Sequence, residues 1–93
     1  MYVRTETLWF YVGENKYVQF EMISRKGEKV IVTDATYVIT HNGEVVANGP
    51  CEIVNGNSVQ FLIQMNERGT FDVELTYNVA PETRKARCKI NVD

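Results

Sequence analysis

Regular alternation of apolar and polar residues in the last quarter of the chain predicts a β-hairpin. Between residues 69 and 78 every second residue is apolar, and the same alternation returns between residues 83 and 92. Because successive side chains of a strand point to opposite faces, each half has one apolar face and one polar face. Pro81 lies between the halves, and its fixed φ and missing N–H favour a four-residue turn at residues 79–82.

A turn at residues 79–82 sets the register of the whole hairpin, with Asn78 facing Thr83. The facing pairs that follow are Glu74 with Arg87, Asp72 with Lys89, Val73 with Cys88, and Phe71 with Ile90. A slip of one residue would place apolar side chains against charges along both strands. Exposed ion pairs contribute only about 0.2–1 kcal/mol each, so we expect them to fix the register more than to supply stability.

Further strands are predicted by turn residues that recur along the rest of the chain at intervals of roughly 8–12 residues, without helical periodicity. Asn42 and Gly43 supply the two residues with positive φ that a type I′ hairpin turn needs. We therefore predict an all-β protein, an antiparallel sandwich of two sheets with about seven to nine strands; a barrel is the alternative. Tyr37, Phe61 and Phe71 are expected to be buried together with Leu75. The other expected strands are residues 8–12, 17–23, 35–40, 45–47, 51–54 and 58–65.

The length of 93 residues predicts a single domain, residues 1–93. Ten basic against twelve acidic residues give a net charge of −2, so we expect neither a nucleic-acid nor a membrane partner. The basic stripe of Lys85, Arg87 and Lys89 lies beside Asp72 and Glu74, and we expect the two groups to neutralise each other. The first residues lack the order of a signal peptide, which predicts a cytoplasmic or virion-associated protein. A surface location would follow if the chain were part of a longer protein.

Three stretches resemble an immunoglobulin-like sandwich: residues 34–40, residues 49–53 and Gly69-Thr-Phe-Asp-Val-Glu-Leu75. The last is similar to Gly-Thr-(Tyr/Phe)-x-Val-x-Leu at the start of the penultimate strand of such domains. The resemblance implies that Tyr37 is the inward aromatic of the third strand and that Phe71 replaces the tyrosine of a tyrosine corner. The chain also looks like the small immunoglobulin-like modules of bacterial genomes, including prophage structural genes, which implies a structural or surface component.

No pattern for catalysis, a cofactor or a metal emerges from the sequence. His41 is the single histidine and opens a turn, where a solvated side chain is the usual situation. Neither Ser24 nor Ser58 lies in a nucleophile-elbow pattern, and the carboxylates are spread along the chain. Cys51 and Cys88 fall on inward positions of different strands, and we interpret them as free buried thiols; an inter-sheet disulfide is the alternative. We therefore predict a protein that is not an enzyme and has no cofactor or metal.

We therefore predict that the protein is a non-catalytic binding or assembly module; a carbohydrate-binding or adhesion domain is the alternative. All of residues 8–12 are apolar, so either face of this strand carries apolar side chains. Burial of the set at 8, 10 and 12 leaves Trp9 and Tyr11 pointing outward. Leu62 points outward between Gln60 and Gln64. We expect the first two strands and residues 58–65 to share a sheet, so that Trp9, Tyr11 and Leu62 form one contact patch.

This patch would serve a protein partner or self-association. Its competing interpretation is that residues 1–7 fold back and cover it. Exposure of Trp9 and Tyr11 together on a flat face would favour the carbohydrate-binding alternative.

Overall fold

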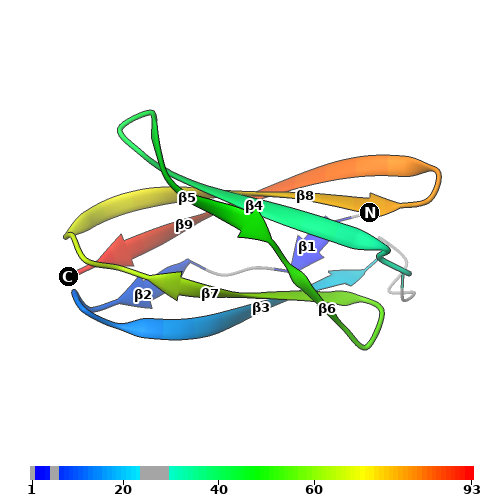
Figure 1. The fold of residues 1–93 in the computed structure, drawn as a ribbon, viewed down its shortest axis with the longest axis horizontal. Coiled ribbons are helices and arrows are strands. Elements are labelled where there is room, and N and C mark those ends of the chain that lie inside the picture. The colour runs from blue at the N-terminus through cyan, green and yellow to red at the C-terminus, as the bar shows by residue number, and fades with distance from the viewer. Residues whose placement is uncertain (1, 5–6, 24–29) are drawn as a thin grey trace.

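The chain forms a β-sandwich of two sheets, seen in a computed structural model that describes residues 2–4, 7–23 and 30–93 (Figure 1). Nine strands lie within the described residues, and their order is β1-β3-β7-β6 in one sheet and β2-β9-β8-β4-β5 in the other. Two separate sheets confirm the predicted sandwich and exclude the barrel. No described helix is long and apolar enough to cross a membrane. The strands are β1 (Tyr2–Arg4), β2 (Leu8–Phe10), β3 (Asn15–Ile23), β4 (Asp34–His41), β5 (Glu44–Pro50), β6 (Glu52–Val54), β7 (Ser58–Gln64), β8 (Gly69–Val79) and β9 (Glu82–Val92).

The hairpin of β8 and β9 has the register that the alternation predicts. Asn78 faces Thr83, and the ladder continues to Gly69 opposite Val92 without a shift. The turn is shorter than predicted: Val79 also pairs with Glu82, which leaves only Ala80 and Pro81 as the loop.

The hairpin of β4 and β5 turns at Asn42 and Gly43, whose φ angles of 52° and 82° confirm the predicted type I′ turn. The register then shifts, because Thr40 pairs with Val45 whereas Ile39 pairs with Ala47. Val46 is therefore the extra residue of a β-bulge, a feature that twists a strand and is common at sheet edges.

The core lies between the two sheets, where the predicted inward side chains meet. Phe61, Phe71 and Leu75 are buried, and Tyr37 is half-buried and packed against the same cluster. The expected burial is confirmed for Phe61, Phe71 and Leu75, whereas Tyr37 packs on the same core but stays partly exposed.

Three features of the N-terminal part differ from the sequence-based expectation. Tyr2–Arg4 forms an unpredicted strand along β3. β2 runs parallel to β9, so the sandwich is not purely antiparallel. β2 also ends at Phe10, and Val12 is exposed instead of inward. The predicted polar loop at residues 24–29 lies outside the described residues. Residues 1 and 5–6, part of the segment that would cover Trp9 in the competing interpretation, lie outside them as well.

Candidate binding groove between two open sheet edges

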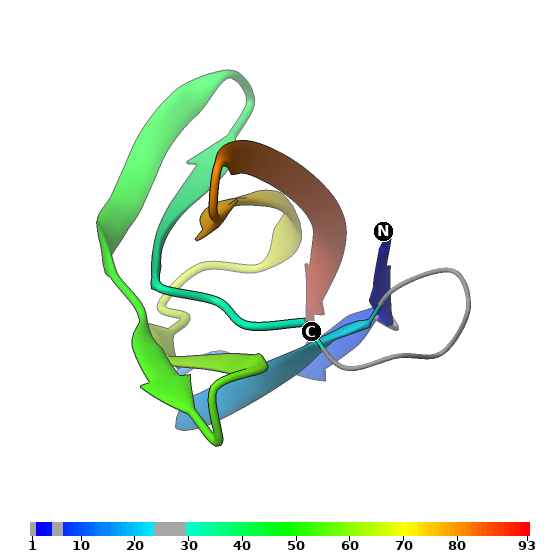
Figure 2. The same cartoon turned by 90° about the vertical axis from the view of Figure 1, so that its right-hand side faces the viewer.

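One side of the sandwich has an open edge because β6 is much shorter than its neighbour β7. β6 pairs with Ser58, Val59 and Gln60 only, whereas β7 continues to Gln64. In the other sheet β5 is the last strand, with β4 as its one neighbour among the described residues. Figure 2 shows the chain passing from β5 to β6 along this side, opposite the side where β1 lies. The second half of β7 and the outer edge of β5 thus face each other with no described strand between them.

A groove of about 550 Å³ lies between these two edges. Its floor contains Tyr37 from β4 and Phe61 from β7, whose stacked rings bridge the two sheets. Leu62 lies on the β7 side, and Val46 and Ala47 lie on the β5 side.

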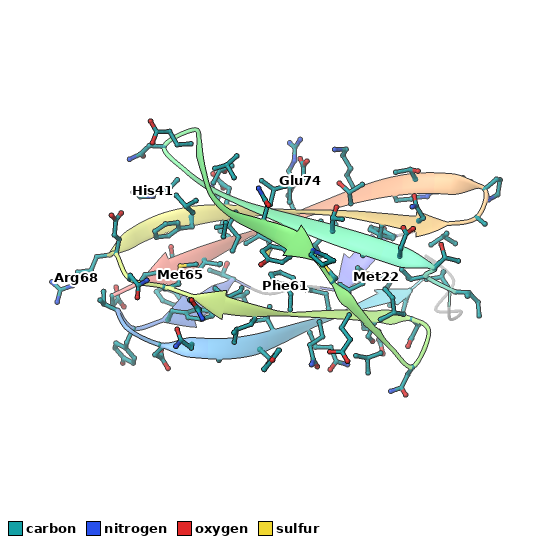
Figure 3. The ribbon with its side chains drawn as sticks, in the orientation of Figure 1. Met22, His41, Phe61, Met65, Arg68 and Glu74 are labelled. Atoms are coloured by element: carbon teal, nitrogen blue, oxygen red, sulfur yellow. The ribbon has the colours of Figure 1, made fainter. Side chains whose placement is uncertain are left out.

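A second hollow of about 200 Å³ extends the groove toward the end of β7. It shares Val46, Ala47, Gln64 and Asn66 with the first hollow and reaches Met65 and Phe71. Figure 3 shows Phe61 and Met65 following one another along this side of the sandwich. The two hollows therefore form one elongated groove with an apolar floor.

The backbone at the end of β7 has hydrogen-bonding groups directed toward this open side. Met65 donates its N–H to Glu14 O at 3.2 Å and accepts from Gly13 N at 2.7 Å, so both of its groups face the β3 side. In an antiparallel strand the residues that bond to one neighbour alternate with those that face the opposite side. The N–H and C=O of Leu62 and Gln64 therefore face away from β3, where β6 no longer reaches.

The charges that line the groove are all acidic. Glu52 lines the first hollow and Glu67 the second, and no lysine or arginine of the described residues lines either. Neither glutamate makes an ion pair with another described residue. The side chains of Gln60, Gln64 and Asn66 add amide groups, and Tyr17 and Tyr37 add hydroxyl groups. The groove thus combines an aromatic floor, polar walls and two acidic side chains.

The three residues expected to form one contact patch lie in two different places. Trp9 and Tyr11 are 62% and 71% exposed, at and just after β2 in the five-stranded sheet. Leu62 is half-buried on β7 in the four-stranded sheet, where it lines the groove. The expectation of a single patch is wrong, because β2 leaves the sheet of β1 and β3 to pair with β9.

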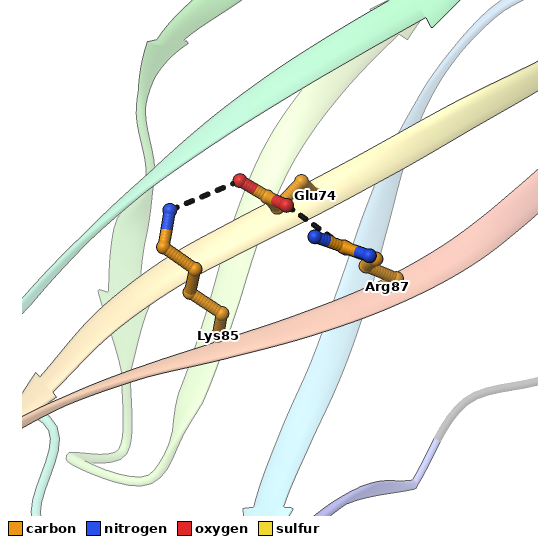
Figure 4. Close-up of polar contacts among 3 residues, drawn as sticks. All are labelled: Glu74, Lys85 and Arg87. Atoms are coloured by element: carbon orange, nitrogen blue, oxygen red, sulfur yellow. Dashed lines mark hydrogen bonds and ion pairs between the residues drawn. The ribbon is translucent and has the colours of Figure 1, made fainter.

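The outer face of the five-stranded sheet carries the predicted self-neutralised charges. Glu74 accepts hydrogen bonds from Lys85 Nζ at 3.1 Å and Arg87 Nε at 2.9 Å (Figure 4). These hydrogen bonds, from Lys85 first, lower the pKa of Glu74. Asp72 pairs with Lys89 at 3.0 Å. The basic stripe is therefore engaged within its own sheet.

The described residues with reactive side chains lie apart from one another. Cys51 and Cys88 are free and half-buried, and burial raises the pKa of each thiol to about 11. The His41 ring stacks on Phe71 with 4.3 Å between centroids, and its Nδ1 lies 3.1 Å from Thr70 O. His41 is thus more enclosed than the solvated turn residue that we expected. Over the described part of the chain no group of three or more histidine, cysteine or carboxylate side chains is arranged to hold a metal ion.

The sequence analysis missed the groove, although the chain contains a signal for it. The strand predicted at residues 51–54 lies between two Asn-Gly dipeptides and has half the length of the following predicted strand at residues 58–65. A short strand beside a long one leaves part of the long strand unpaired. The mismatch in length could have located the open edge, whereas the facing strand β5 is fixed only by the packing of the two sheets.

Comparisons with known proteins support the fold and give no family. No family model matches the chain, and no curated protein matches it. One solved structure that is similar is a crystal structure of an engineered protein from the Northeast Structural Genomics Consortium. It matches 98% of this chain with a TM-score of 0.76 and 13% sequence identity, and this chain spans 20% of that protein's length. At this identity the likeness shows the fold alone.

Proposed function

We propose that this protein is a non-catalytic binding or assembly module that holds a segment of a partner protein in the groove between β5 and β7. The observation that carries the proposal is the groove of about 550 Å³, with the stacked rings of Tyr37 and Phe61 at its floor, at the place where β6 stops pairing with β7. Grooves that combine aromatic and apolar side chains with a few placed polar groups are the usual form of binding sites. The engaged charges of the β8–β9 face make that face a weaker candidate.

We further propose that the sandwich is of the immunoglobulin-like kind. The order β1-β3-β7-β6 and the order β9-β8-β4-β5 correspond to the two sheets of such domains, with β5 as the additional edge strand. Domains of this architecture serve many functions, so the fold supports a binding role without specifying the partner. The bacterial or phage-derived setting implied by the resemblance stays a prediction.

Selection from a library of 12-residue peptides displayed on phage tests the proposed function. We expect the protein to enrich peptides whose binding is abolished by Val46→Lys, because Val46 lines both hollows of the groove. Val45→Lys is the matched control: Val45 is similarly exposed on the same strand but does not line the groove. Absence of enriched peptides, or equal sensitivity to both substitutions, would contradict binding in the groove.

Carbohydrate binding is a second candidate, favoured by the exposure of Trp9 and Tyr11. Exposed aromatic rings at a sheet edge provide the apolar surface on which sugar rings stack. Trp9 is the single tryptophan of the chain, so its fluorescence reports on this place alone. A saturable change on addition of cellohexaose or xylohexaose, lost in Tyr11→Ala, would support carbohydrate binding. An unchanged emission with both oligosaccharides would count against it.

A further inference from the structure

We propose that the occupant of the groove is an extended, basic-flanked segment of a partner protein that adds a strand to β7 where β6 ends. This inference rests on the proposed function, because it names the class of partner for the same groove. Addition of a strand to an open sheet edge uses main-chain hydrogen bonds for affinity and alternate side chains for specificity.

The backbone groups of β7 that face the open side favour an extended partner over a helical one. The N–H and C=O of Leu62 and Gln64 face the open side, as the bonding of Met65 to Gly13 and Glu14 establishes. A helix satisfies its backbone groups internally and would leave these donors and acceptors without a protein partner. An extended chain places matching groups at the same spacing as β7 and can bond to both residues.

The path of β6 defines where the added strand lies and how long it is. Cys51 donates its N–H to Ala35 O at 2.8 Å, so the chain turns from β7 toward β4 at this residue. The space beside β7 is therefore open from Leu62 to Met65, the length of a strand of about four residues.

The existing pairing of β6 also predicts the side-chain pattern of the added strand. Ile53 lies opposite the buried Val59, whereas the exposed Glu52 lies opposite Gln60. Residues that face each other across two strands point to the same side of the sheet. Continuing this alternation, partner residues opposite Ile63 and Met65 point into the groove, and those opposite Leu62 and Gln64 point to solvent. We expect small or medium apolar residues at the two inward positions.

The acidic residues at the two ends of the groove favour basic residues on both sides of the bound segment. Glu52 belongs to the strand that bounds one end, and Glu67 follows β7 at the other end. Arg68 is the nearest basic residue to Glu67 in the sequence, and its side chain points outward from the end of the sandwich (Figure 3). A segment with Lys or Arg on either side of its apolar positions would complement both glutamates.

Backbone N-methylation of the most enriched 12-residue peptide tests this inference. Two versions are made, N-methylated at alternate residues in the even or the odd positions, and their affinities are measured by calorimetry. Strand addition predicts that one version loses at least about tenfold in affinity, because N-methylation removes the donors that bond to Leu62 and Gln64. The other version should stay within about threefold. A similar affinity of both versions and the parent peptide would overturn strand addition.

The charge preference is tested with the double substitution Glu52→Gln and Glu67→Gln. We expect selected peptides to carry Lys or Arg outside two apolar residues at alternate positions, and this variant to bind them at least about fivefold more weakly at low salt. Glu21→Gln with Glu44→Gln is the control, because both residues are exposed and neither lines the groove. Acidic or uncharged peptides, or equal losses in both variants, would overturn the charge assignment.

Different results would contradict strand addition and groove binding. Peptides that depend on Val46 but tolerate N-methylation would overturn the extended strand and leave the proposed function standing. Peptides that are insensitive to Val46→Lys would overturn the proposed function itself.

Discussion

The ring of Tyr37 lies almost parallel to the ring of Phe61, with 4.1 Å between the centroids and 10° between the planes. Tyr37 comes from β4 and Phe61 from β7, so this stack joins the two sheets across the core. It lies at the floor of the open groove, where no further strand covers it among the described residues. The same pair of rings thus closes the core and provides the apolar surface of the candidate site.

Removing the Tyr37 ring should lower stability substantially. Tyr37→Ala removes the stack on Phe61 and opens a gap in the core, and we expect a loss of about 2–4 kcal/mol in urea-induced unfolding. Tyr11→Ala is the control because Tyr11 is 71% exposed, and it should change stability by less than about 0.5 kcal/mol. Equal effects of the two substitutions would show that the stack does not join the sheets.

Gly69 should not tolerate a side chain. Its φ of +131° is disfavoured for other residues, and a Cβ there would lie 3.0 Å from His41 Cε1. We expect Gly69→Ala to cost about 1–3 kcal/mol in unfolding free energy. In a His41→Ala background the steric part disappears, and the cost of the same substitution should fall without vanishing. An unchanged cost would mean that the contact with His41 is irrelevant.

Both thiols should react slowly in the folded protein. Burial raises the pKa of Cys51 and of Cys88 to about 11, which reduces the reactive thiolate at pH 8 about a hundredfold relative to an ordinary cysteine. Mass spectrometry after brief iodoacetamide treatment should therefore find the native chain unmodified and the urea-denatured chain alkylated twice. A native mass lower by two protons would establish a disulfide, and rapid native alkylation would contradict the burial.

The Glu74 cluster should make stability depend on acid pH. Lys85 and Arg87 lower the pKa of Glu74, so the ionised form of this carboxyl is more favoured in the folded protein than in the unfolded chain. The resulting stabilisation is present above the ordinary glutamate pKa of about 4.3 and is lost as the pH falls through the lower pKa of the folded state.

Glu74→Gln should therefore reduce the dependence of unfolding free energy on pH in this acid range. Near neutral pH, from about 6 to about 8, the slope of unfolding free energy against pH should stay unchanged. Urea unfolding at a series of pH values provides the measurement. A Gln variant with the same acid dependence as the wild type would show that other groups are responsible.

The C-terminal hairpin was predictable because its information is local. Alternation fixes the faces, and the opposed charges of Glu74 and Arg87 are compatible with a single register. The turn at Asn42 and Gly43 was predictable for a similar reason, since two adjacent residues determine it.

The position of β2 was not predictable in this way. Trp9 pairs with Asn91, and nothing in the sequence near either residue specifies a parallel partner so far along the chain. Because β2 lies in the five-stranded sheet, Trp9 and Leu62 belong to different sheets and do not form the expected patch. Strand 51–54 was correctly predicted to be short, but the opposite wall at Val46 required the three-dimensional arrangement of both sheets.

Hydrogen exchange at individual β7 amides tests the central claim most directly. In the free protein the Leu62 and Gln64 amides should exchange much faster than the Ile63 amide, which faces β3 and serves as an internal control. Saturation with the most enriched peptide should slow Leu62 and Gln64 at least about tenfold and leave Ile63 nearly unchanged. Slow exchange of Leu62 and Gln64 in the free protein, or no change on peptide binding, would contradict an open edge that receives an added strand.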